Sequence, residues 1–185
     1  ENVCLHVGAG TFLPVKSQFI EGHKMHTEPF SVSLAMLKTL HSALSEGKPI
    51  ISVGTTSTRT LESLYFIGVH CIETGTPSDV EQWEPYREEG YSYSSSQSIF
   101  AIIKYLEDNN LKELISRTGI IIVPGYKFNI IDYLVTNFHQ PQSTLLLLIS
   151  AFVGEGNWQK IYDYALANGF RFLSYGDSSL LKRVG

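Results

Sequence analysis

The sequence predicts an α/β protein in which helices flank a largely parallel or mixed sheet. Short apolar, β-branched runs alternate along the chain with longer amphipathic runs, which is the order of strands and helices in such folds. Glycine or proline separates many of these runs. The chain has 185 residues, of which 43% are hydrophobic, and this is enough to build one domain around its own core.

The first half of the chain contains the clearest alternation. Ser33 is a suitable N-cap for a helix whose leucines recur at helical spacing, and Gly47 is suited to end that helix. A short apolar strand and a second helix follow. The elements expected here are a strand at 2–7, a tight loop at 8–11, an extended segment at 25–32, a helix at 34–46, a strand at 49–53 and a helix at 57–67.

A stretch rich in glycine, proline, serine and tyrosine, at 74–98, interrupts this alternation. Beyond it the helical periodicity returns, and Pro124 and Gly125 end an apolar, β-branched run. The elements expected here are helices at 98–109 and 111–117, a strand at 119–123, one or two strands within 127–138, helices at 143–153 and 157–168, and a last strand at 170–175.

Composition and charge narrow the classes of function. The formal net charge of −4 gives no overall basic field, so contact with RNA would need a local patch. Two cysteines do not make a disulfide framework, which favours a reduced, cytoplasmic setting. The apolar run at 145–149 is too short to span a bilayer, and no signal peptide opens the chain. Because the chain starts within an expected strand and without methionine, we interpret it as part of a longer protein.

The most informative motif is the turn after the strand at 49–53. Its residues are Gly54-Thr55-Thr56-Ser57-Thr58-Arg59. They place hydroxyls, free backbone N–H groups and a cation at the C-terminal end of a strand, where α/β proteins bind small anionic or nucleotide-like ligands. The alternative is a capped helix on whose surface Arg59 pairs with Glu62, one turn later.

A glycine turn follows the first expected strand. Gly8 and Gly10 match half of a dinucleotide-binding fingerprint and Thr11 follows them, but Leu13 stands where a third glycine belongs and Pro14 comes next. The turn is therefore either a place where a ligand approaches the backbone or a plain tight turn.

Two histidines, His23 and His26, lie three residues apart. On a helix they could share a metal, but the local pattern is not helical and no further cysteine, histidine or acidic cluster completes such a site. We therefore expect no metal. The stretch is either a loop that contacts substrate or an exposed polar loop.

Two polar stretches near the C-terminus contain further candidates. Asn137 and His139 precede a buried helix, and loop residues at a sheet edge are commonly functional, although a lone histidine is also found as a structural residue. Tyr175 and Asp177 follow the last expected strand, where Asp177 could orient a ribose, accept a proton or simply stabilise a turn. We expect these two stretches and the turn at 54–59 to converge on one hollow.

Taken in order, six blocks of the sequence resemble one family, the S-adenosylmethionine:tRNA ribosyltransferase-isomerases of queuosine biosynthesis. Together they cover most of the chain apart from about 68–118. The blocks lie at 5–15, 23–28, 51–62, 124–128, 134–145 and 171–177.

The resemblance implies an unusual reaction. The ribosyl part of S-adenosylmethionine is transferred and isomerised onto 7-aminomethyl-7-deazaguanine at the wobble position of tRNA, which gives epoxyqueuosine and releases adenine and methionine. S-adenosylmethionine is then a consumed substrate, and neither a cofactor nor a metal is expected. The implied partners are this tRNA and S-adenosylmethionine, for a cytoplasmic, monomeric protein that does not contact membranes.

The resemblance also implies roles for the candidate residues. The sulfonium acidifies the adjacent 5′-methylene, so a positioned base can remove a proton, and adenine needs a proton donor to leave. The acid–base role falls to His139 or His6, and the ribose contact to Asp177, with Asp132 as the alternative carboxylate. The loop at 55–59 would hold the methionine carboxylate or a tRNA phosphate. The expected substrate-binding residues are Gly8, Gly10, Thr11, His26, Thr55, Thr56, Ser57, Arg59, Asn137 and Tyr175.

The chain departs from the family in three ways. It lacks the family's upstream half with its small β-barrel, so we interpret 1–185 as a partial catalytic domain and expect it to be inactive by itself. The residues at about 70–112 are unlike the family's connection, and form either an insertion that contacts tRNA or a decorated loop. Val123 and Gln140 replace the usual tyrosine and leucine in their motifs.

Two other hypotheses remain open. A nucleotide- or tRNA-binding module of the same fold would lack turnover, and release of adenine from S-adenosylmethionine separates it from an enzyme. A Rossmann-type methyltransferase is disfavoured by the incomplete glycine motif. Methyl transfer to tRNA would favour it again.

Overall fold

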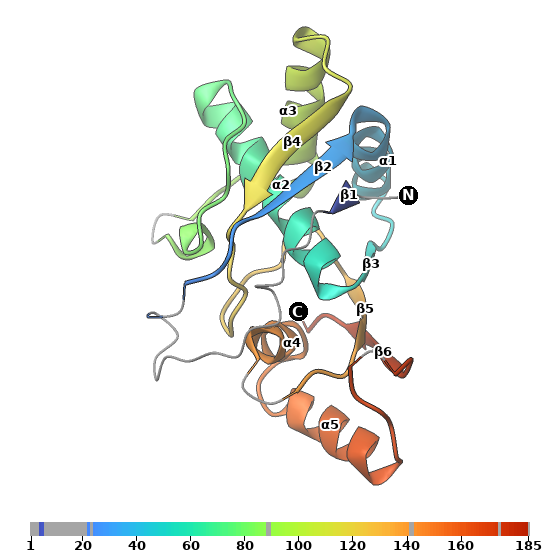
Figure 1. Ribbon diagram of the computed structural model, residues 1–185. Helices are drawn as coiled ribbons and strands as arrows, with labels where there is room; N and C mark the ends of the chain where they lie inside the picture. The colour runs from blue at the N-terminus through green and yellow to red at the C-terminus, as the bar shows by residue number, and fades with distance from the viewer. Residues whose placement is uncertain are drawn as a thin grey trace.

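The computed structural model describes residues 4–5, 22, 24–87, 90–140, 143–173 and 175–184. Within these residues helices pack against two small sheets (Figure 1). The elements are, in order, β1 (Cys4–Leu5), β2 (Glu28–Ser33), α1 (Leu34–Ser45), β3 (Ile51–Val53), α2 (Thr55–Thr74), the 3-10 helix η3 (Glu84–Tyr86), α3 (Ser95–Asp108), β4 (Glu113–Thr118), β5 (Tyr133–Asn137), α4 (Thr144–Val153), α5 (Asn157–Ala167) and β6 (Ser178–Lys182).

The first sheet is antiparallel and has the order β1-β2-β4. β2 and β4 pair along their whole length, with Phe30 opposite Ser116. Burial alternates along both strands, so Phe30, Val32 and Leu114 point into the core. In Figure 1 this pair lies among α1, α2 and α3 in the upper part of the molecule.

The second sheet has the order β3-β5-β6, with β3 parallel and β6 antiparallel to β5. This arrangement confirms an α/β protein with a mixed sheet. β6 is antiparallel to β5, and β5 is parallel to β3. The N-terminal end of β6 therefore lies beside the C-terminal ends of β3 and β5, at one edge of the sheet. α4 and α5 lie beside this sheet in the lower part of Figure 1.

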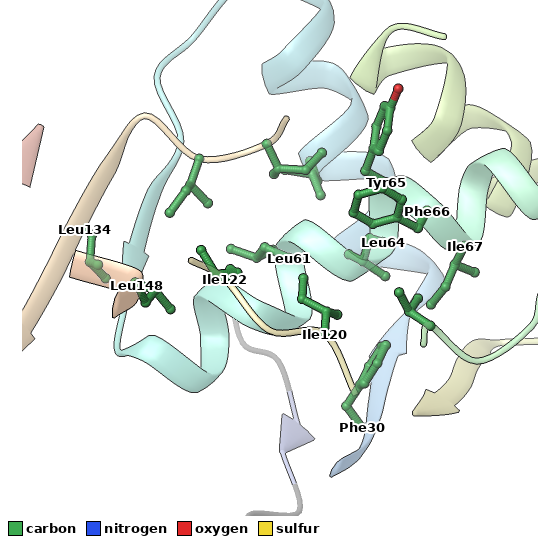
Figure 2. Close-up of a cluster of buried hydrophobic side chains, with 14 of the residues drawn as sticks. Phe30, Leu61, Leu64, Tyr65, Phe66, Ile67, Ile120, Ile122, Leu134 and Leu148 are labelled. Carbon is green, nitrogen blue, oxygen red and sulfur yellow. The ribbon is translucent and has the colours of Figure 1, made fainter. Parts of the chain in front are cut away.

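The core is built around α2. All its side chains from 58 to 69 are buried, which is typical of a helix enclosed by other elements. Figure 2 shows Leu61 and Leu64 of this helix near Ile120 and Ile122, which come from the extended segment before β5. The same helix therefore packs against elements of both sheets.

Gly68 brings α2 and α3 into backbone contact. A Cβ atom at this position would lie 2.2 Å from the backbone oxygen of Ser98, far inside van der Waals contact. α3 starts nearby with a capping box, in which Ser94 and Gln97 satisfy each other's backbone N–H groups. The pair of helices is thus positioned by a small residue and a capped helix start.

The helices expected at 34–46, 143–153 and 157–168 are confirmed as α1, α4 and α5. Ser33 and Ser143 cap the first two, and each accepts a hydrogen bond from a backbone N–H of the first turn. α2 and α3 also form, but each begins a few residues earlier than expected, and α2 continues to Thr74.

Among the extended segments, β2, β3 and β5 fall within or beside the expected ranges, and β1 covers two residues of the range 2–7. The tight loop expected at 8–11 lies outside the described residues.

The helix expected at 111–117 is wrong. Residues 113–117 belong to β4, in which burial alternates with a period of two and every residue pairs with β2. The strand expected at 119–123 is wrong too. It is a buried, extended segment that donates hydrogen bonds to the backbone oxygens of Val80 and Gln82 and joins neither sheet.

The strand expected at 170–175 is also wrong in its described part. Leu173 has a φ of +63°, which ends extended structure, and the strand β6 begins only at Ser178. Phe170 and Phe172 instead pack their rings against Phe138, so the apolar pattern of this stretch reflects an aromatic cluster.

Candidate functional site

Three of the predicted site stretches meet at one edge of the second sheet. The backbone N–H of Gly54, just after β3, donates to the oxygen of Val135 in β5 (2.8 Å). On the other side of β5, Asn137 pairs with Ser178, and its side-chain Nδ2 donates to the backbone oxygen of Asp177 (3.2 Å). The turn after β3, the end of β5 and the start of β6 are therefore neighbours along the sheet, as expected, whereas the hollow that they were expected to share stays a prediction.

The turn after β3 forms the start of α2. Gly54 has a φ of +89°, a conformation that glycine adopts without strain, and no side chain caps the helix. Thr58 Oγ1 donates to Ser52 Oγ (3.0 Å) and lies 3.1 Å from the oxygen of Gly54, which ties the turn to β3. The N–H groups of the first turn have no partner within the helix, and they lie at the positive end of its dipole. This geometry suits an anionic group of a ligand.

Arg59 lies in the interior. Its Nη1 donates to Glu28 Oε2 (2.9 Å) and its Nε to the backbone oxygen of Ile120 (3.0 Å). Nη2 is buried without a hydrogen-bond partner among the described residues. Burial lowers the pKa of Arg59, and the carboxylate of Glu28 opposes this shift. The surface pair of Arg59 with Glu62 is therefore wrong, because Arg59 pairs with Glu28 on β2.

Glu62 instead holds the segment that leads into β5. It accepts hydrogen bonds from the backbone N–H groups of Asn129, Ile130 and Ile131 and from the hydroxyl of Tyr126, at 2.8 to 3.0 Å. Burial raises the pKa of Glu62, while these four donors oppose the shift. The residue is buried and positions the chain that carries the site.

His139 is half-buried next to the same edge. Its Nε2 lies 3.0 Å from Thr136 Oγ1, and its backbone N–H donates to the hydroxyl of Tyr162 (3.0 Å). Burial lowers the pKa of His139 to about 4. The imidazole is therefore neutral at pH 7 and can accept a proton, but burial makes it a weaker base than a free imidazole.

Asp177 is held by its neighbour in the turn before β6. Its Oδ2 accepts hydrogen bonds from the backbone N–H (2.6 Å) and the Nε (3.0 Å) of Arg171. The hydrogen bonds from Arg171 lower the pKa of Asp177. Tyr175 in the same turn is exposed. The carboxylate is thus ionised and oriented at the edge of the sheet.

The alternative carboxylate, Asp132, lies at the other end of β5. It accepts a hydrogen bond from the backbone N–H of Ile50 (3.0 Å) and pairs with Arg183 (3.2 Å). β5 separates it from Asn137 by about 16 Å, at 3.3 Å per residue. Asp132 therefore does not reach the candidate site.

The remaining predicted residues are not brought to this edge by the described structure. His6, Gly8, Gly10 and Thr11 lie outside the described residues, and His26 is exposed just before β2 of the first sheet. The described residues contain no group of three or more histidine, cysteine or acidic side chains that could hold a metal ion. None of the described helices has the length and hydrophobicity to cross a membrane.

Sequence reasoning missed the residues that support the site. Thr136 and Tyr162 hold His139, Arg171 holds Asp177, and Glu28 holds Arg59. Thr136 and Arg171 gave a local signal, because each lies in the same block as the residue that it holds, and Glu28 lies in another of the six blocks. Tyr162 lies in none of these blocks.

A comparison with known protein families identifies the family of this chain, which the geometry alone does not. A family model described as "Queuosine biosynthesis protein" matches residues 1–181. The chain belongs to this family. The names of its members indicate a class of reaction for this family.

Individual relatives agree with the family match. The chain is 41% identical over 182 residues to an S-adenosylmethionine:tRNA ribosyltransferase-isomerase of Caulobacter sp. (strain K31), covering 98% of this chain and 38% of the relative. It is 40% identical over 181 residues to the protein of the same name from Treponema denticola, covering 98% and 41%. A crystal structure of S-adenosylmethionine tRNA ribosyltransferase from Thermotoga maritima superposes with a TM-score of 0.56 at 27% identity, covering 83% of this chain and 40% of that one. The chain thus spans about two fifths of the length of these relatives.

Proposed function

We propose that this chain forms part of the catalytic domain of an S-adenosylmethionine:tRNA ribosyltransferase-isomerase. In this proposal the ribosyl moiety of S-adenosylmethionine is transferred and isomerised onto 7-aminomethyl-7-deazaguanine at the tRNA wobble position, giving epoxyqueuosine, adenine and methionine. The family match and the names of the relatives support the reaction class. The observation that carries the proposal is the common edge where the start of α2, His139 and Asp177 meet.

The geometry supports one division of roles. His139 accepts the proton of the methylene next to the sulfonium, which the positive sulfur acidifies. Burial keeps the imidazole unprotonated at pH 7 and at the same time makes it a weaker base than a free imidazole. The free N–H groups of Thr55, Thr56 and Ser57 bind the methionine carboxylate or a phosphate at the positive end of α2. Asp177 accepts a hydrogen bond from a ribose hydroxyl. Arg59 lies in the interior and contributes in one of two ways. Its Nη2, which has no hydrogen-bond partner among the described residues, contacts the ligand, or the side chain positions the first turn of α2.

The wider setting follows from the same proposal. The partners are tRNA and S-adenosylmethionine, the protein works as a monomer in the cytoplasm, and no cofactor or metal takes part. Gly8, Gly10, Thr11, His6 and His26 would complete the substrate contacts. The remaining length of the family's chain would supply the rest of the site. The segment at about 70–112 contains the end of α2, η3 and α3, and its role, either an insertion that contacts tRNA or a decorated loop, stays a prediction.

The decisive experiment measures release of adenine from S-adenosylmethionine. The assay uses a chain that joins these 185 residues to the remaining length of the Caulobacter relative, with tRNA that carries 7-aminomethyl-7-deazaguanine. We expect adenine release that depends on this tRNA, and a loss of kcat of about 100-fold or more in His139→Ala. His41→Ala, a histidine of α1 outside the candidate site, is the matched control. Unchanged turnover in His139→Ala would remove the assigned role.

The pH profile separates a base from an acid. A base with a pKa of about 4 predicts a kcat that rises with pH through this value and is constant from about pH 6 to 8. A general acid with the same pKa would instead give a kcat that falls as the pH rises through this value. If tRNA binds but no adenine is released at any pH, the alternative of a non-catalytic tRNA-binding module replaces the enzyme.

A further inference from the structure

A groove of about 650 Å³ runs between α5 and the free edge of β6. Among the described residues, β6 pairs with β5 along its other edge and with no second strand. We call it the α5–β6 groove, and the lining residues that matter below are Phe138, Lys160, Tyr164, Phe170, Ser178 and Lys182. Phe138 and Ser178 directly follow Asn137 and Asp177, so one end of the groove opens at the candidate site.

Exposed aromatic rings form one wall of the groove. Tyr164 is 65% exposed and Phe170 37%, and their ring centroids lie 6.3 Å apart. Phe170 in turn packs against Phe138, which is buried, at 5.6 Å. Rings that are exposed on one side and supported on the other are suited to stacking on unpaired nucleobases.

Two lysines give the groove a positive charge. Lys160 lies on α5 and Lys182 at the far end of β6 from the candidate site. Within the described part of the chain, neither ammonium group forms an ion pair. In a chain with a net charge of −4, these two free cations supply the local patch that contact with RNA requires.

The edge of β6 adds backbone N–H and C=O groups that the sheet leaves unpaired. Such an edge could also pair with an added polypeptide strand. Two free lysines beside exposed aromatic rings favour a polyanion with flat bases over a polypeptide. Resting on the proposed function, we propose that the α5–β6 groove binds unpaired nucleotides of the tRNA next to its wobble base.

The test measures binding of a fluorescent anticodon stem–loop RNA hairpin to the 185-residue chain by anisotropy, at several salt concentrations. Tyr164→Ala is expected to weaken binding about fivefold or more, the loss of one stacked base. The double change Lys160→Gln and Lys182→Gln is expected to weaken binding and to lower the slope of log K against log salt by about 2. Ile115→Ala and Lys38→Gln, an exposed apolar residue of β4 and an exposed lysine of α1, are the controls and should bind as the original chain does.

A second readout locates the RNA directly. Hairpins with 4-thiouridine beside the wobble position should crosslink within residues 157–182. The proposal is overturned if the chain does not bind the hairpin, if the controls weaken binding as much as the groove variants, if duplex RNA competes as well as the hairpin, or if the crosslinks lie elsewhere. A groove that holds a polypeptide would leave RNA binding unchanged in all variants, which also overturns it.

The two proposals fail separately. If adenine is never released but hairpin binding depends on Tyr164 and the lysines, the reaction is wrong and the groove stands. If adenine is released and the groove variants bind the hairpin normally, the reaction stands and the groove is wrong.

Discussion

The two sheets of this protein differ in their outer faces. In the first sheet, the face away from the core carries the polar or charged side chains Ser31, Ser33, Glu113 and Arg117, together with Pro29 and the 73% exposed Ile115. In the second sheet, the corresponding face carries Ile51, Val53 and Leu180, which are 56%, 67% and 65% exposed. Antiparallel sheets commonly leave one polar face in water, whereas parallel strands are usually covered on both faces.

Both sheets contribute buried side chains to the same core. The inner face of the first sheet packs on the core around α2, and Leu134 and Leu181 of the second sheet belong to that core too. The second sheet also contains the parallel pair β3–β5, the candidate site and an apolar outer face. The proposed site and the exposed apolar face therefore lie on one sheet, whereas both sheets contribute to stability.

The largest expected effect breaks the connection between the two regions. Glu62→Ala leaves three backbone N–H groups and the hydroxyl of Tyr126 without their acceptor in the interior. We expect a loss of about 3–5 kcal/mol in the free energy of unfolding, measured in urea. Glu107→Ala removes a half-exposed carboxylate of α3 and should change the free energy by less than about 0.5 kcal/mol. Equal losses in the two variants would show that Glu62 does not hold the second sheet.

The second expected effect is a pH dependence of stability that arises from His139, next to the second sheet. The pKa of His139 is about 4 in the folded chain and 6.5 in the unfolded chain, so the unfolded chain takes up the proton first as the pH falls. The contribution of His139 to stability is complete above pH 6.5 and is lost between pH 6.5 and pH 4, by up to about 3 kcal/mol. We expect His139→Gln to remove this part of the pH dependence, measured as the difference in unfolding free energy between pH 7 and pH 4.5. A variant with the original pH dependence would contradict the buried, neutral imidazole.

The smallest effect tests the two sheets with the same substitution. Val32 is buried in the first sheet and Val53 is exposed in the second, so a hydroxyl is introduced into the core in one case and into solvent in the other. We expect Val32→Thr to cost about 1–3 kcal/mol and Val53→Thr less than about 0.5 kcal/mol, measured by thermal or urea unfolding. A large loss at Val53 would mean that the outer face of the second sheet is covered in the chain itself.

The sequence predicted the features that depend on neighbours along the chain. Ser33 and Ser143 mark true helix starts, because a cap needs only the first turn of its own helix. The edge that joins Gly54 to Asn137 also followed from sequence, because parallel strands place their C-terminal ends together.

Features that depend on distant partners were not accessible in this way. The residues of β4 were mistaken for a helix because their partners in β2 lie eighty to ninety residues away along the chain. Arg59 was paired with Glu62 by helical spacing, whereas Glu28 reaches it from another strand. The stretch at 170–173 has the composition of a strand, but its rings pack on Phe138. A local sequence pattern predicts which face of a helix or strand is buried, but not which distant residues pack against that face.

The four hydrogen bonds that Glu62 accepts have a consequence for how parts of the candidate site move relative to one another. α2 begins at the turn after β3, and about two turns later Glu62 binds the three N–H groups that precede β5. Any small displacement of this helix therefore carries the Gly54 turn and the start of β5 in the same direction. The distance between the two should fluctuate little, so groups drawn from far-apart stretches of the chain keep a constant spacing.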